Sequence, residues 1–148
     1  MRGEYISNLS EAHRSRIRIT LTLLDEALVK FEAWAQGREV RSVLYREENT
    51  LAPDRRAGLL TDIADIRRII RELRDDLHLE ARPQDIAKTI RGQCYILWVD
   101  VLEMTCKYLG GFGEPPPELV DYLDPKTQRI LQYLDHLKAL LTNPDSLG

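Results

Sequence analysis

Apolar residues recur at intervals of three and four along most of this 148-residue chain, while strand-type alternation is scarce. This spacing places apolar side chains along one side of an α-helix. Proline and glycine interrupt the pattern at intervals. The chain is therefore predicted to be mostly helical, with long helices over about residues 9–36, 53–79, 83–109 and 125–142.

The ends of the first three helices carry recognisable signals. Asn8 followed by Glu11 resembles a capping box, and Gly37 offers a stop or a bend for the first helix. Pro53 and Pro83 each suit the first turn of a helix, because a proline there lacks only an N–H that would have no partner in the helix.

The junction between the third and fourth helices is rich in glycine and proline. The glycine pair at 110–111 predicts a left-handed stop for the third helix. Residues 118–123 are predicted to form one or two helical turns. Asp124 is predicted to be the N-cap of the last helix, directly before Pro125.

Residues 38–49, "REVRSVLYREEN", are ambiguous. Val40, Val43 and Leu44 would suit a continuation of the first helix past a bend at Gly37, and a short strand is the alternative. The helical interpretation is favoured. The conformation of residues 38–52 is the least constrained part of the chain.

Four long amphipathic helices with mostly short connections have one common packing solution. The predicted fold is all-α: an antiparallel up-and-down four-helix bundle with a short extra helix or turn between the third and fourth helices. A chain of 17.1 kDa is about the size of one domain. Residues 1–148 are therefore predicted to form a single helical-bundle domain.

The most apolar stretch is residues 93–111, "QCYILWVDVLEMTCKYLGG". A membrane span needs about 20 residues with few or no charges, and the longest uninterrupted apolar run here is Cys94 to Val99. The stretch is instead predicted to be a helix that is buried on nearly every side, with only a narrow polar edge in water.

Both cysteines, Cys94 and Cys106, lie in this stretch. Twelve helical residues separate two thiols by about 18 Å, too far for a disulfide within one helix. Neither cysteine belongs to a C-x-x-C motif. They are predicted to be free, buried and inert thiols, and the protein is predicted to be cytoplasmic.

The third predicted helix has more apolar surface than three neighbouring helices readily cover. It is either central within the monomer or covered by a second copy of the chain. Self-association as a homodimer is therefore predicted. The residues assigned to this contact are Tyr95, Trp98, Leu102 and Leu109.

A stripe of cationic residues runs along the second predicted helix, formed by Arg67, Arg71, Arg74 and His78. Arginine forks match phosphate oxygens, so a phosphate ligand or a nucleic acid would suit this stripe. However, Glu72 and Asp75 are spaced to form ion pairs along the helix. A solvated or subunit-bridging face is the favoured interpretation.

Three histidines, His13, His78 and His136, could meet as a metal site in a bundle. The spacings that mark such sites are missing, since there is no H-x-x-x-H and only one D-x-x-H. No metal and no cofactor is therefore predicted. A metal-binding four-helix bundle is kept as a second alternative for function.

The loop "GFGEPPPELVDYL" combines an aromatic residue with three successive prolines. It could be an exposed docking element, but a stiff connector between two helices is the favoured interpretation. The chain contains no phosphate-binding glycine loop and no nucleophile motif. Acyl transfer and dinucleotide chemistry therefore have no support in the sequence.

The function predicted from these features is that of a non-catalytic helical interaction or regulatory module that associates with itself. A protein partner is possible, and no membrane contact is expected. The first alternative is a helical domain that binds or hydrolyses phosphate esters or nucleic acid through the arginine stripe. A net charge of −3 argues against a general polyanion binder.

Overall fold

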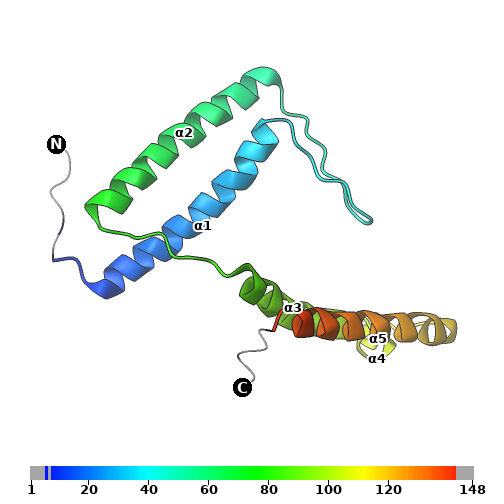
Figure 1. The fold of residues 1–148 in the computed structure, drawn as a ribbon. Helices are drawn as coiled ribbons and strands as arrows, with labels where there is room; N and C mark the ends of the chain where they lie inside the picture. The colour runs from blue at the N-terminus through cyan, green and yellow to red at the C-terminus, as the bar shows by residue number, and fades with distance from the viewer. Residues whose placement is uncertain (1–5, 7, 143–148) are drawn as a thin grey trace. The chain divides into compact units, whose positions relative to one another are not determined.

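The structure is a computed structural model that describes residue 6 and residues 8–142, and it is shown in Figure 1. This part of the chain contains five α-helices and one 3₁₀ turn, and it contains no strand beyond an isolated β-bridge. The predicted all-α class is confirmed. The four-helix bundle topology is not confirmed, because there are five helices. Helix α1 pairs with α2, and α3 pairs with α5.

The chain divides into two compact units, with the boundary between Ala81 and Arg82. Each unit contains one pair of long helices. The prediction of a single domain over residues 1–148 stays a prediction, and the two units are described separately below.

The first unit is an antiparallel pair formed by α1 (Glu11–Ala35) and α2 (Pro53–Asp76), as Figure 1 shows. Leu28 of α1 and Ile63 of α2 are almost fully buried. Where α1 begins and α2 ends, Arg14 Nε donates a hydrogen bond to the Leu77 carbonyl oxygen at 3.0 Å. Both helices lie close to their predicted ranges.

The end signals of α1 are partly as predicted. The N-cap is Ser10, whose hydroxyl accepts the His13 backbone N–H, so the capping box assigned to Asn8 is wrong. At the other end, Gly37 has a φ of +87° and ends the helix, as its sequence position predicts.

The favoured helix over residues 38–49 is wrong. Residues 38–49, called the arm below, form an extended hairpin that leads away from the ends of α1 and α2 (Figure 1). Arg41 and Arg46 are bridged across it, and Glu47 N donates to the Val40 carbonyl at 2.8 Å. The left-handed Gly37 ends the helical hydrogen bonding, and the side chains of Glu47 and Asn49 then bind the extended backbone.

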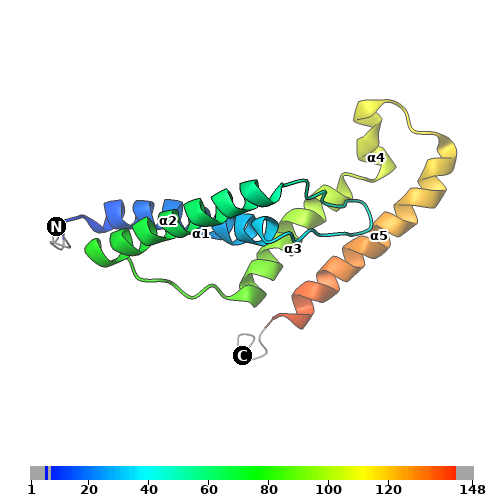
Figure 2. The same ribbon diagram turned by 90° about the horizontal axis from the view of Figure 1, so that it is seen from above.

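The second unit is shown in Figure 2 and consists of α3 (Ile86–Leu102), α4 (Cys106–Leu109), a 3₁₀ turn (Gly110–Phe112) and α5 (Pro117–Leu140). Helices α3 and α5 are antiparallel. Their pairing is held at one end by Arg91, whose Nη1 donates to the Leu141 carbonyl at 2.8 Å.

The single helix predicted over 83–109 is wrong, because residues 103–105 interrupt it. Thr105 Oγ1 donates to the Leu102 carbonyl at 2.8 Å, and the Cys106 backbone N–H donates to Asp124 Oδ1 at 3.0 Å. A hydroxyl and a carboxylate thus replace the hydrogen bonds that would continue the helix.

The prediction that Asp124 is the N-cap of the last helix is wrong, because α5 runs without a break through Pro125. The carboxylate of Asp124 caps α4 instead. The glycine assignment at 110–111 is also wrong. Gly110 is right-handed with φ −54°, and the positive φ of this junction belongs to Gly113.

Within the second unit, α3 is much more exposed than predicted. Cys94 is its one buried residue, while Tyr95, Ile96, Leu97 and Val99 are all exposed. In this unit α5 is the helix that covers α3. Within the second unit, α5 alone does not keep α3 dry, and the prediction of a helix buried on nearly every side stays a prediction.

Over the described residues, no helix is both long enough and apolar enough to cross a lipid bilayer. This agrees with the rejection of a span over residues 93–111.

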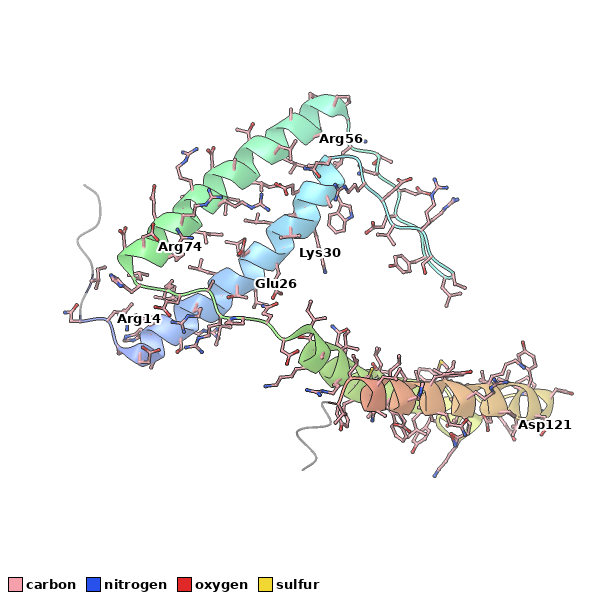
Figure 3. The ribbon with its side chains drawn as sticks, viewed as in Figure 1. Arg14, Glu26, Lys30, Arg56, Arg74 and Asp121 are labelled. Carbon is pink, nitrogen blue, oxygen red and sulfur yellow. The ribbon has the colours of Figure 1, made fainter. Side chains whose placement is uncertain are left out.

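Replacing Gly37 with alanine should lower the free energy of unfolding by about 1 kcal/mol or more, because an L-residue is strained at this φ. An added Cβ would also lie 2.6 Å from Arg56 Nη1, and Figure 3 shows Arg56 at the end of the helix pair from which the arm leaves. Urea denaturation followed by circular dichroism measures the loss.

The matched control is Gly58→Ala inside α2, where an added Cβ meets nothing within 4 Å. Alanine is the better helix former, so this variant should gain about 0.5–1 kcal/mol. Equal effects of the two substitutions would contradict the role assigned to Gly37.

Candidate interaction surfaces

Each helix of the first unit presents one line of residues to the other helix, marked by the buried Leu28 and Ile63. Helices α1 and α2 are antiparallel, so residues rotated in the same sense from these two lines emerge on the same face of the pair. Two faces of opposite chemistry result.

The first of these is a charged face. It receives the whole predicted cationic stripe from α2 together with acidic and basic residues of α1, and its main members are Arg18, Asp25, Glu32, Arg67, Arg71, Arg74 and His78. Figure 3 shows Arg74 on the half of α2 that is distant from the arm. The tertiary structure therefore places acidic side chains of α1 opposite the stripe.

Two members of the predicted stripe are paired with carboxylates. Arg67 Nη1 lies 2.5 Å from Glu32 Oε2 across the helix pair, and Arg74 Nε lies 2.9 Å from Asp75 Oδ1. The pairing with Asp75 raises the pKa of Arg74. Arg71 is exposed. The ion pairs agree with a structural role, and ligand binding by the stripe stays a prediction.

Arg18 is a charged-face residue that the sequence did not single out. Its Nε and Nη1 atoms are buried and make no hydrogen bond. The side chain lines a cavity of about 110 Å³, whose wall also holds Asp25, Arg74 and Glu80. Two carboxylates balance the two guanidinium groups, so the chemistry of this cavity does not select an anion.

The other side of the first unit is mostly apolar. We define the apolar face of the first unit by five residues that are exposed or half-buried: Leu24, Phe31, Leu59, Ile66 and Ile69. Within the first unit, no third helix covers this face.

The second unit repeats this arrangement around its own contact line, marked by the buried Cys94 and Leu131. To one side of Leu131, the surface of α5 is polar and carries Asp121 and Asp135. On the opposite side, apolar residues of both helices emerge together. We define the apolar face of the second unit by Ile86, Ile90, Leu97, Ile130 and Leu137, which are between 38% and 73% exposed.

The four residues predicted for self-association lie elsewhere. Trp98, Leu102 and Leu109 are half-buried within the unit. Tyr95 is exposed, and Lys138 Nζ lies 4.1 Å from the centre of its ring. Tyr95, Trp98 and Leu102 are rotated from Cys94 toward the polar side of the pair. Their role in self-association stays a prediction.

The sequence analysis missed the apolar face of the second unit because it predicted that the third helix is buried on nearly every side. A usable signal was present: Ile86, Ile90 and Leu97 recur at intervals of four and seven, a spacing that marks one side of a helix. What the sequence could not supply was the side of α3 that α5 covers.

Both cysteines are free and buried, as predicted. Burial raises the pKa of the Cys106 thiol, and the neighbouring Asp124 carboxylate raises it further because a thiolate there would face a like charge. A raised pKa suppresses the reactive thiolate form. The structure gives Cys106 no feature of a working nucleophile.

The three histidines lie on or next to three different helices. His13 Nδ1 lies 2.8 Å from the Ser10 hydroxyl at the start of α1, and His136 is on α5 in the other unit. No group of three or more possible ligand residues that could hold a metal ion occurs among the residues with described positions.

The glycine-rich and proline-rich loop connects α4 to α5, and Phe112 in it is 94% exposed. Gly113 follows with its positive φ. The interpretation of this loop as a stiff connector stays a prediction, as does the docking alternative.

Comparison with known proteins adds no identification. No family model matches the chain, and neither the curated proteins nor the solved structures contain a significant match. Function must therefore be argued from the surfaces.

Replacing Arg18 with methionine should leave the free energy of unfolding unchanged or raise it by about 1 kcal/mol, because its buried Nε and Nη1 atoms make no hydrogen bond that the substitution would remove. Thermal and urea unfolding measure the change. The matched control is Arg16→Met on the exposed side of α1, which should stay within about 0.5 kcal/mol of the parent. A loss above about 1 kcal/mol in the Arg18 variant would show that its guanidinium has a stabilising partner.

Cys94 and Cys106 should react with dithionitrobenzoate at least about tenfold more slowly in native buffer than in denaturant, since both are buried. A Ser42→Cys variant, with its new thiol in the exposed arm, supplies the fast-reacting control. Immediate labelling of all thiols in native buffer would contradict the burial.

Proposed function

We propose that this protein is a self-associating helical interaction module, in which the apolar face of the second unit is the contact between two copies. This keeps the function predicted from the sequence and assigns it to different residues. The supporting observation is the gathering of Ile86, Ile90, Leu97, Ile130 and Leu137 on one exposed side of a helix pair.

Single exposed apolar residues are normal on soluble proteins, whereas a contiguous apolar patch beside polar surface marks an interaction site. Fully burying one leucine or isoleucine side chain contributes about 1.5–3 kcal/mol. Five such residues, which are already partly covered, still supply enough apolar area to offset the entropy lost on association.

Stacking two copies through this face would also complete a common architecture. Two antiparallel helix pairs packed face to face give four helices around one apolar core. The four-helix arrangement predicted for one chain would then form between two chains. A two-fold symmetric contact is self-complementary, so one apolar face suffices for both partners.

The test is a pair of charge substitutions, Leu97→Glu and Ile130→Glu, examined by light scattering behind a sizing column and by sedimentation equilibrium. The parent protein should be a dimer at micromolar concentration. Each variant should weaken dimerisation by at least about tenfold, because a carboxylate would be buried in the contact without a partner.

The matched control is Leu23→Glu, which replaces an exposed leucine on the outer side of α1. It should leave the dimer unchanged. A parent protein that sediments as a monomer at tens of micromolar, or variants that dimerise like the parent, would overturn the proposal.

A further inference from the structure

We propose that the cavity beside Arg18 in the first unit binds a small zwitterion, an amino acid of the size of glycine or alanine. The carboxylate of the ligand accepts hydrogen bonds from Arg18, and its ammonium group donates to Asp25 and Glu80. The carrying observation is that one cavity holds buried guanidinium donors, which have no acceptor among the described residues, together with two carboxylates. This site does not rest on the proposed self-association.

Three segments of the first unit form the wall of this cavity. Helix α1 contributes four residues spaced at three, four and seven, which share one side of a helix: Arg18, Leu21, Thr22 and Asp25. Helix α2 contributes Ile70 and Arg74, one turn apart, and the chain after α2 contributes residues 79–81. The first unit therefore forms the cavity by itself.

The chain reaches the wall of the cavity after α2 because a left-handed residue ends that helix. His78 has a φ of +50°, and the Leu79 backbone N–H donates to the Arg74 carbonyl at 2.8 Å. This combination is the Schellman motif, a common helix end. The Leu77 carbonyl accepts from Arg14 Nε at 3.0 Å, which fastens the same turn to α1, and Figure 3 shows Arg14 and Arg74 at this end of the pair. The residues that follow are thus held beside the cavity.

Arg18 supplies the donors for the carboxylate of the ligand. Its Nε and Nη1 atoms are buried and donate to no group in the described part of the chain, so they do not donate to Asp25 or Glu80. Buried donors are almost always satisfied, and an unsatisfied one in a cavity points to a bound group that supplies the acceptor. Carboxylate oxygens are among the strongest acceptors for guanidinium N–H groups.

The two carboxylates of the wall require a positive charge on the same ligand. The second guanidinium of the wall is already engaged, because Arg74 Nε lies 2.9 Å from Asp75 Oδ1. Arg18 therefore stands against Asp25 and Glu80, which would repel a ligand that is only anionic. An ammonium group carries three donors and no acceptor, so it suits these two carboxylates. The charges of the wall thus favour a ligand that carries both signs.

The volume and the remaining wall residues limit the size of the ligand. The cavity measures about 110 Å³, a little less than four water molecules at about 30 Å³ each. Glycine and alanine match this size, and Leu21 and Ile70 offer apolar contact to the methyl group of alanine. The Thr22 hydroxyl donates to the Arg18 carbonyl at 2.8 Å, so its oxygen can still accept a hydrogen bond from the ammonium group.

The test is a titration of the full nitrogen-15-labelled chain with L-alanine, followed by nuclear magnetic resonance of the backbone amides and of the Arg18 Nε–H group. A dissociation constant of about 1 mM or below is expected, with shifts confined to residues around the cavity. Acetate and ethylammonium each carry only one of the two charges. Both should bind at least about tenfold more weakly than L-alanine.

Two sets of variants assign the binding to these side chains. Arg18→Met, which should fold at least as stably as the parent, should weaken the binding of L-alanine by at least about tenfold, while the control Arg16→Met should leave it unchanged. The double variant Asp25→Asn, Glu80→Gln should reverse the preference, so that acetate binds more tightly than L-alanine. A purely structural role of the two carboxylates would not produce this reversal.

The outcomes separate the zwitterion site from its alternatives. No shift with L-alanine at about ten times the expected dissociation constant would indicate a cavity filled by water only and would overturn the inference. Acetate that binds as tightly as L-alanine to the parent, or an Arg18→Met variant that binds like the parent, would overturn it as well. None of these results bears on the proposed self-association, which is tested by variants of the second unit.

Discussion

The structure depends on one constraint: two helices that pack against each other cover only one stripe of each. Leu28 and Ile63 mark that stripe in the first unit, and Cys94 and Leu131 mark it in the second. An amphipathic helix has an apolar side wider than one neighbour covers. In both units the remainder emerges beside the contact line, and because the helices are antiparallel it emerges on the same face from both of them.

This geometry sorts the chemistry of each pair into two sides. In the first unit the arginine stripe meets the acidic residues of α1, and the pair between Arg67 and Glu32 satisfies charges that looked unpaired along a single helix. Part of the charged side thus has a structural role within its unit, whereas the apolar side has none. That difference is the reason for proposing a function for the apolar surfaces rather than for the cationic stripe.

The sequence predicted the first helix pair well and the second less well, and the difference has a physical cause. The limits of α1 and α2 follow from local signals such as Gly37 and Pro53. The interruption before α4 depends on a hydrogen bond from the Cys106 backbone to Asp124, which is eighteen residues away in sequence. The arm likewise depends on Asn49, whose side chain reaches back to Trp34. Hydrogen bonds between residues so far apart in sequence leave no sign in the spacing of apolar residues.

By itself, the sequence determined that the chain is helical, which residues are apolar on each helix, and that its thiols are free and buried, because spacing and residue type are local properties. Only the tertiary structure decided that α1 pairs with α2 and α3 with α5, that residues 38–49 leave the helix as a hairpin, and which side of α3 faces α5. The reason is that periodicity gives a helix an apolar side, while the identity of the neighbour that covers it is set by turns and by hydrogen bonds between distant residues.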